Sequence, residues 1–170
     1  KWKTCKETMR IGGVRLGSRT NKNTPAAAFA TIKENNHIRF IWQTGKYYCP
    51  QVTEALRAAG ELPNLYVTDF IKDMAAAYAA SDLVISRAGA GSISEFCLLH
   101  KPVVLVPSPN VAEDHQTKNA LALVDKQAAI YVKDSEAEAK LMDVALSTVA
   151  DDRKLKELSE NIAKLALPDS

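Results

Sequence analysis

Residues 83–92, with the sequence LVISRAGAGS, decide the fold of this chain. Their first half, Leu83–Ser86, is apolar without alternation, which predicts a strand buried on both faces, as in a parallel sheet. Two glycines follow, and then a helix is expected from Ser92 to His100. A buried strand, a glycine-rich turn and a helix form the repeating unit of parallel α/β folds.

The same alternation extends in both directions along the 170 residues. Further strands are predicted to end near Ile11 and to lie at Ile38–Trp42, Leu65–Val67, Val103–Val106 and Ala129–Val132, with helices between them. The strand before Ile11 is less apolar than the others. We therefore predict one Rossmann-like α/β domain over residues 1–170, with a doubly wound parallel sheet of about six strands.

Composition excludes several classes of protein. With 46% hydrophobic and 25% charged residues the chain is globular, and a net charge of +2 is too balanced for a typical nucleic-acid binder. No apolar run reaches the roughly 18–20 residues of a membrane span. The three cysteines form no C-x-x-C pair and no zinc spacing, so we expect reduced thiols and no metal site.

Ligands of parallel α/β sheets bind at the carboxyl ends of the strands. After Ser86, the glycines Gly89 and Gly91 let a ligand approach the backbone, and the helix expected from Ser92 offers free N–H groups to an anion. The dinucleotide pattern G-x-G-x-x-G is incomplete, because Ser94 occupies the third glycine position. The loop therefore predicts a phosphate site other than a standard NAD site.

Glu95 has two interpretations. Residues 92–95, SISE, match a capping box, in which Glu95 would only close the helix N-terminus. Alternatively, Glu95 lies one turn from the phosphate site, where its carboxylate can accept hydrogen bonds from both hydroxyls of a ribose. The motif by itself favours the cap.

Two other loops carry polar candidates. His115 and Gln116 begin a helix after an apolar strand, where they either hold sugar hydroxyls or form a solvated first turn capped by Asp114. His115 could also act as a base, but no motif places a Ser or Cys nucleophile beside it. In the first loop, Gly12–Arg19, two arginines could contact a diphosphate or a sugar, although the P-loop pattern is absent.

Three motifs together resemble the MurG family of bacterial glycosyltransferases. They are residues 73–78 (DMAAAY), 86–95 (SRAGAGSISE) and 115–120 (HQTKNA), and residues 41–46 (IWQTGK) fit the same pattern. The resemblance covers about residues 10–170 and implies the C-terminal, nucleotide-sugar-binding half of a two-domain GT-B enzyme. The N-terminal half, which in the family binds the lipid acceptor and the membrane, is then expected outside this chain.

The resemblance also implies roles for individual residues, and it favours the ribose role for Glu95. The uracil would meet the backbone of Ile71, and His115 and Gln116 would bind the hydroxyls of N-acetylglucosamine (GlcNAc). The diphosphate would be held by Ala90, Gly91 and Ser92. Further candidates for substrate contact are Arg15, Gly17, Arg87 and Asn119. The first loop departs from the family pattern at Val14 and Arg15.

By resemblance, the whole enzyme would transfer GlcNAc from UDP-GlcNAc to undecaprenyl-diphosphoryl-MurNAc-pentapeptide, with inversion, to make lipid II for peptidoglycan. It would work in the cytoplasm as a peripheral protein on the inner face of the plasma membrane. We expect no cofactor and no essential metal, since no Asp-x-Asp motif is present. The general base is expected in the N-terminal domain, so this chain alone should be inactive.

Two alternatives belong to other classes. One is a non-catalytic donor-binding subunit that needs a separate partner chain, as in the eukaryotic dolichol-pathway GlcNAc transferase, and the bacterial-type motifs argue against it. The other is a dinucleotide-binding oxidoreductase domain. The absent third glycine disfavours that reading.

Overall fold

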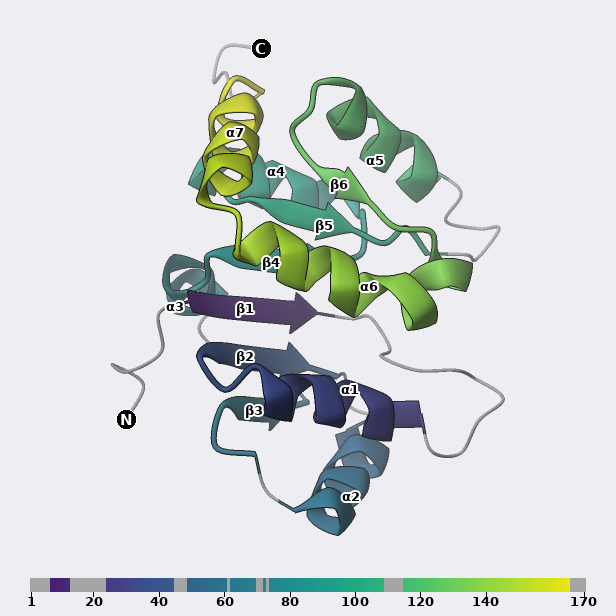
Figure 1. Cartoon of the computed structure of the whole chain (residues 1–170). Helices are drawn as coiled ribbons and strands as arrows, with labels where there is room; N and C mark the ends of the chain where they lie inside the picture. Colours follow the sequence, from purple (N-terminus) through teal and green to yellow (C-terminus); the bar gives the residue numbers. More distant parts are fainter. Residues whose placement is uncertain are drawn as a thin grey trace. The chain divides into compact units, whose positions relative to one another are not determined.

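The structure is a computed structural model of the chain, and it describes residues 7–12, 24–44, 49–60, 62–69, 72, 74–108 and 115–165. The chain divides into two compact units, Lys1–Ser81 and Asp82–Ser170. Each unit has a parallel sheet with helices packed around it (Figure 1). The predicted α/β fold with parallel strands is thereby confirmed.

The first unit has a three-stranded parallel sheet in which β2 (Ile38–Gln43) lies between β1 (Glu7–Gly12) and β3 (Leu65–Thr68). The register places Glu7 opposite Ile38 and Phe40 opposite Leu65. The strand expected before Ile11 is therefore confirmed: β1 pairs with β2 along its whole length despite its polar sequence. The helices are α1 (Thr24–Glu34), α2 (Cys49–Ala59) and α3 (Met74–Ala80).

Aromatic packing and one buried amide hold the first unit together. Trp42 is fully buried and meets Phe29 edge to face, with ring centroids 6.5 Å apart. The buried Asn64 donates through Nδ2 to the carbonyl oxygens of Ile32 (3.0 Å) and Ile38 (2.9 Å). One side chain thus ties the turn before β3 to the end of α1 and the start of β2, and it satisfies carbonyls that burial would otherwise leave without partners.

The second unit repeats the pattern with β5 (Val103–Leu105) between β4 (Leu83–Ser86) and β6 (Ile130–Tyr131). All pairings are parallel, with Val84 opposite Val103 and Val104 opposite Ile130. Its helices are α4 (Ala90–Leu99), α5 (His115–Asp125), α6 (Asp134–Val149) and α7 (Asp152–Ala163). Helix α6 packs on β4, α5 on β6, and α7 on both α4 and α6.

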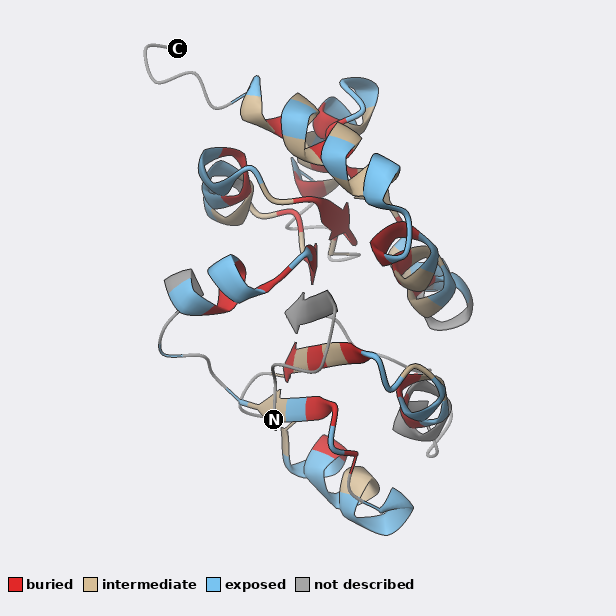
Figure 2. Cartoon of the chain, turned by 60° about the vertical axis from the view of Figure 1, so that its left-hand side comes forward, coloured by how far each residue is buried: buried red, intermediate tan, exposed pale blue. Residues whose placement is uncertain are grey.

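The core of the second unit is built on the two strands predicted from their unbroken apolar sequence. All four residues of β4 and all three of β5 are buried. Buried residues gather along the strands and on the inner sides of the helices, whereas the outer sides are exposed (Figure 2). A strand covered on both faces has no solvent-facing side to mark by alternation, which is why β4 and β5 are continuously apolar.

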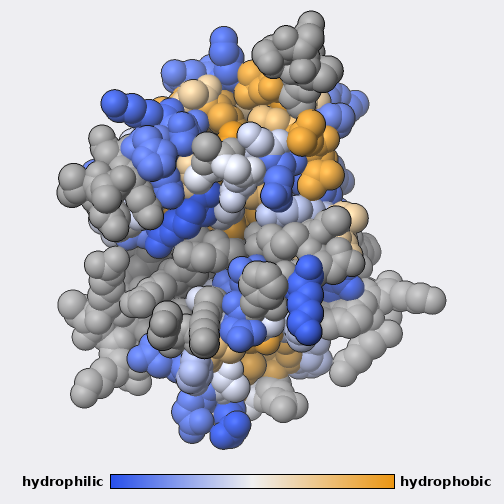
Figure 3. Space-filling view, turned by 180° about the vertical axis from the view of Figure 1, so that it is seen from behind, coloured by the Kyte–Doolittle hydropathy of each residue, from blue (hydrophilic) through white to orange (hydrophobic). Residues whose placement is uncertain are grey.

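Several leucines of this unit are exposed, and two of them lie at the end of α4 that is far from its glycine-rich loop. Leu98 and Leu99 are 67% and 46% exposed at the last turn of α4, about 10 Å along the helix axis from Gly91. Leu121 of α5 and Leu165 after α7 are also exposed. Hydrophobic side chains are visible on the surface of this unit in Figure 3. Among the described residues, no helix combines the length and the apolar character that crossing a bilayer requires.

Candidate functional site

Three strand-to-helix connections of the second unit begin at the same edge of its sheet. Because β4, β5 and β6 are parallel, their carboxyl ends lie together, and the chain then leads into α4, α5 and α6. Two of these connections carry residues predicted from the sequence. They are the loop after β4, with Arg87 and the glycines, and the segment after β5, which ends at His115 and Gln116.

The helix of the glycine-rich loop begins earlier than predicted, because its N-cap lies three residues before Ser92, the N-cap of the predicted capping box. Helix α4 starts at Ala90 and has Gly89 as its N-cap, in an extended conformation and without a side-chain capping bond. Ser92 therefore lies inside the first turn, where it cannot be the N-cap of a capping box. The capping interpretation of Glu95 is wrong for this reason, and the carboxylate is not needed to close the helix.

The N-terminus of α4 is open to a ligand. By helix geometry, the N–H groups of Ala90, Gly91 and Ser92 have no carbonyl within the helix to bond. Gly91 is exposed, and no described atom lies within 4 Å of a Cβ built there. Glu95 is exposed one turn further along the helix. The arrangement can bind an anion at the helix end, with a carboxylate placed to accept hydroxyl hydrogen bonds beside it.

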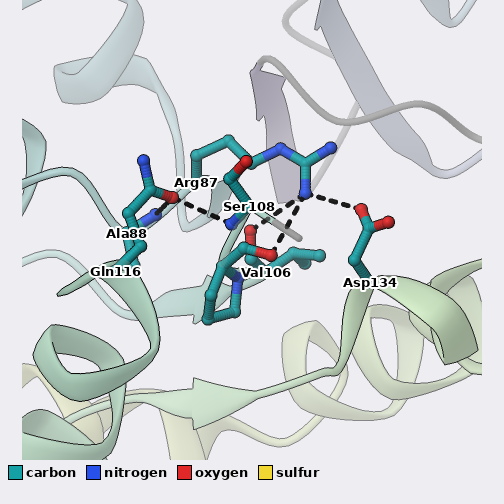
Figure 4. Close-up of polar contacts among 7 residues, drawn as sticks. Arg87, Ala88, Val106, Ser108, Gln116 and Asp134 are labelled. Atoms are coloured by element: carbon teal, nitrogen blue, oxygen red, sulfur yellow. Dashed lines mark hydrogen bonds and ion pairs between the residues drawn. The ribbon is translucent and has the colours of Figure 1, made fainter. Parts of the chain in front are cut away.

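The buried side chain of Gln116 joins the two loops of the site. Its Oε1 accepts hydrogen bonds from the backbone N–H of Ser108 (2.9 Å) and that of Ala88 (3.3 Å), as Figure 4 shows. Asn119, one turn further along α5, donates through Nδ2 to the carbonyl oxygen of Ala88 at 3.3 Å. The first two turns of α5 therefore hold the backbone immediately before the N-cap of α4.

These contacts refine the roles predicted for the start of α5. An amide oxygen accepts two hydrogen bonds, and both are used at Gln116 Oε1, so a bond from this side chain to a sugar hydroxyl would have to come from Nε2. His115 is exposed as the first residue of α5. A contact of either residue with a sugar stays a prediction.

Arg87 connects the same two loops to a third. Its Nη1 donates to the carbonyl oxygens of Val106 (3.2 Å) and Pro107 (3.4 Å), and it lies 2.6 Å from Oδ1 of Asp134, the first residue of α6 (Figure 4). The two charged side chains are 26% and 23% exposed. The sequence did not predict a role for Asp134, because nothing local links it to Arg87, 47 positions away.

Three predicted contact residues, Arg15, Gly17 and Ile71, lie outside the described residues. Of Ala90, the structure describes the backbone position at the start of α4. Over the described ranges, His, Cys, Asp and Glu side chains form no group of three that could hold a metal ion. The expectation that no metal or cofactor is required stays a prediction.

Among the residues that the structure describes, burial shifts the pKa of two groups, and both lie at the end of the sheet opposite the candidate site. Burial raises the pKa of the Cys97 thiol, which lies in the last turns of α4. Burial also lowers the pKa of Lys101, just before β5, although the nearby charge of Asp82 acts in the opposite direction. Both groups lie at the amino-terminal end of the sheet and therefore take no part in the candidate site.

A parallel α/β fold, with a ligand-accessible helix N-terminus after a glycine-rich turn, is typical of nucleotide-binding domains of the Rossmann-like class. The family model described as glycosyltransferase family 28 C-terminal domain matches residues 11–170. The chain therefore belongs to this family.

Similar proteins agree with this assignment. The chain is 90% identical, over 97% of its length, to a protein of Bacteroides thetaiotaomicron named UDP-N-acetylglucosamine--N-acetylmuramyl-(pentapeptide) pyrophosphoryl-undecaprenol N-acetylglucosamine transferase. It is 73% identical to the protein of the same name in Bacteroides fragilis. The chain covers 44% and 43% of these relatives, less than half of their length. The crystal structure of Acinetobacter baumannii MurG matches 95% of this chain and 46% of its own, with a TM-score of 0.74 and 28% identity.

Proposed function

We propose that this chain is the donor-binding domain of an enzyme that transfers GlcNAc from UDP-GlcNAc to a lipid-linked MurNAc-pentapeptide in peptidoglycan synthesis. The observation that carries the proposal is the open N-terminus of α4, where Gly89 caps the helix without a side-chain bond and Glu95 is exposed one turn away. Family membership and the names of the relatives support the same substrate class.

In the proposed complex, the diphosphate of the donor lies at the first turn of α4. The N–H groups of Ala90, Gly91 and Ser92 donate to its oxygens, and the helix dipole adds about 0.3–1 kcal/mol. Glu95 accepts hydrogen bonds from the two ribose hydroxyls, each worth roughly 1.5–3 kcal/mol when it is shielded from water. These contacts select a ribonucleoside diphosphate over a single phosphate.

The sugar of the donor extends toward the start of α5. His115 and the Nε2 group of Gln116 bind GlcNAc hydroxyls, and Gln116 also holds the loop on which the diphosphate rests. Because Oε1 is occupied by two backbone donors, Gln116 acts on the sugar only as a hydrogen-bond donor. This arrangement couples recognition of the sugar to the geometry of the phosphate site.

In the transfer step, the acceptor hydroxyl attacks the anomeric carbon, the bond from that carbon to the diphosphate breaks, and UDP leaves. The negative charge that develops on the diphosphate is met by the N–H groups at the start of α4, which stabilise the transition state most strongly at this point. The proton of the hydroxyl passes to a base outside this chain. We therefore expect the chain alone to bind the donor without transferring its sugar.

The remaining part of the enzyme supplies the acceptor and membrane contacts in this proposal. The chain spans less than half of its relatives, and two of its exposed leucines, Leu98 and Leu99, lie at the far end of α4 from the proposed donor site. The protein would accordingly meet the cytoplasmic face of the membrane through its other half.

Calorimetric titration of the chain with UDP-GlcNAc, UDP and NAD tests the proposal. We expect the two uridine ligands to bind and NAD not to bind. Glu95→Ala should weaken uridine diphosphate binding by about 1–3 kcal/mol, which is less than two shielded hydrogen bonds would contribute because Glu95 is exposed. Binding of NAD in place of UDP would contradict the assignment. Transfer to a lipid acceptor by this chain alone would contradict only the expectation that the chain is inactive without the rest of the enzyme.

A further inference from the structure

One guanidinium nitrogen joins three strand-to-helix connections of the second unit. Arg87 itself is the first residue after β4, and its Nη1 donates to the carbonyl oxygens of Val106 and Pro107 in the segment after β5. The same nitrogen donates to Oδ1 of Asp134, which begins the helix after β6. Figure 4 shows these acceptors converging on the end of the Arg87 side chain.

The surroundings make the Arg87–Asp134 pair unlike the surface ion pairs of the chain. Its side chains are 26% and 23% exposed, whereas Glu136 and Lys140 in the same helix are 49% and 61% exposed at a distance of 3.4 Å. Exposed pairs are screened by water and salt, and many contribute almost nothing. A half-buried pair at 2.6 Å is screened less and fixes the position of both groups.

A simpler explanation is that Asp134 only complements the dipole of α6. Acidic residues favour the first turn of a helix, and this turn contains two, Asp134 and Glu136. The dipole explanation treats the two alike, but their contacts differ. Glu136 pairs with Lys140 on its own helix, whereas Asp134 reaches the loop after β4. Replacing each carboxylate in turn therefore separates the two explanations.

Only Ala88 separates Arg87 from the N-cap of α4. Ala88 follows Arg87, is bound by Gln116 and Asn119, and precedes Gly89, the N-cap. We propose that Asp134 is a positioning residue for the donor: by holding Arg87 against the segment after β5, it fixes the loop that presents α4 to the diphosphate. This inference rests on the proposed function, since the ligand is the uridine diphosphate group of the donor.

The test compares Asp134→Asn with Glu136→Gln, which removes the other carboxylate of the same turn. Titration with UDP should give about tenfold weaker binding for Asp134→Asn, a usual size for coupling between separate sites. Glu136→Gln should bind as the unsubstituted chain does, and Asp134→Glu, which restores the charge, should recover at least part of the loss.

A second measurement separates positioning from loss of stability. Amide hydrogen exchange is compared between Asp134→Asn and the unsubstituted chain, both without ligand. In Asp134→Asn it should be faster at Ala88 and Ser108, whose N–H groups donate to Gln116, while the amides of Ile85 and Val104 in the core strands keep their protection. A general destabilisation would raise exchange at all four.

The outcomes distinguish the two proposals. If the unsubstituted chain binds UDP and Asp134→Asn binds equally well, the positioning role is overturned and the proposed function stands. Equal losses for Asp134→Asn and Glu136→Gln would also overturn it, in favour of the helix dipole. Failure of the unsubstituted chain to bind UDP would overturn both.

Discussion

Oε1 of Gln116 accepts a hydrogen bond from the backbone N–H of Ser108 at 2.9 Å, and the same oxygen accepts a second from Ala88. A side chain predicted to touch the sugar thus also joins two loops of the protein. Because the oxygen and the nitrogen of the amide have different tasks in this account, substitutions can separate them.

Gln116→Ala should lower both stability and donor affinity. It leaves the N–H groups of Ala88 and Ser108 without their acceptor, and an unsatisfied buried donor costs about 1–3 kcal/mol. Urea denaturation should show a loss of this size in the free energy of unfolding. An unchanged midpoint would mean that water or another group replaces Gln116 at no cost.

Gln116→Glu separates the structural role from the binding role. A carboxylate still accepts from both backbone N–H groups, so stability should exceed that of Gln116→Ala. It has no N–H to donate to a sugar and adds a negative charge near the diphosphate, so UDP-GlcNAc affinity should fall by at least about tenfold. The account is wrong on this point if Gln116→Glu binds the donor as the unsubstituted chain does.

His115→Ala should affect the sugar and nothing else. The side chain is exposed at the first residue of α5, so the free energy of unfolding should change by less than about 0.5 kcal/mol. Loss of one hydrogen bond to GlcNAc should weaken UDP-GlcNAc by about 2- to 10-fold and leave UDP unchanged. Equal weakening of both ligands, measured by calorimetry, would place His115 at the diphosphate instead.

Gly91→Ala should stabilise the chain and weaken the donor. Alanine is favoured over glycine in a helix by up to about 1 kcal/mol, and no described atom obstructs the new methyl group. A diphosphate at the first turn of α4 would meet that methyl group and lose about one hydrogen bond, or roughly tenfold in affinity. A more stable variant with undiminished UDP affinity would show that the diphosphate binds elsewhere.

Cys97 should react with iodoacetamide far more slowly than Cys49. Cys97 is 8% exposed and its burial raises the pKa of its thiol, whereas Cys49 is partly accessible. Peptide mass spectrometry after brief alkylation of the native chain measures both rates. Equal labelling would show that α4 opens readily.

The raised pKa of the Cys97 thiol also makes the stability of the chain depend on pH. Since the folded chain holds the Cys97 proton more tightly than the unfolded chain, its contribution to stability is constant below the ordinary pKa of 9.0 and decreases as the pH rises above it. Cys97→Ala should therefore show a smaller loss of stability between about pH 9 and 10 than the unsubstituted chain. If the free energy of unfolding fell equally for both chains over this pH range, the raised pKa of Cys97 would be contradicted.

Sequence patterns predicted the elements whose local chemistry matches their final environment. Strands β4 and β5 are apolar throughout because both faces are covered. The polar β1 was harder to predict, because its place depends on pairing with β2, and local sequence does not encode that pairing.

Only part of the candidate site could be predicted, because some of its contacts are local in the sequence and others are not. The glycines and the carboxylate Glu95 follow from a short motif, but the capping signal at Ser92 placed the helix start too late, because α4 begins at Ala90. The contacts of Gln116, Arg87 and Asp134 join three loops that only the folded sheet brings together. No spacing rule in the sequence indicates such a contact.

The most direct test of the central claim is a nuclear magnetic resonance titration of the ¹⁵N-labelled chain with UDP-GlcNAc. The account predicts that the largest amide shifts occur at Ala90, Gly91 and Ser92, at the start of α4. Glu95 should show a smaller shift, and Leu98 and Leu99 at the other end of the helix should show none. Glu95→Ala should weaken the binding of UDP-GlcNAc without changing which amides shift. Saturable shifts that leave the first turn of α4 unchanged would contradict the claim that this helix holds the diphosphate.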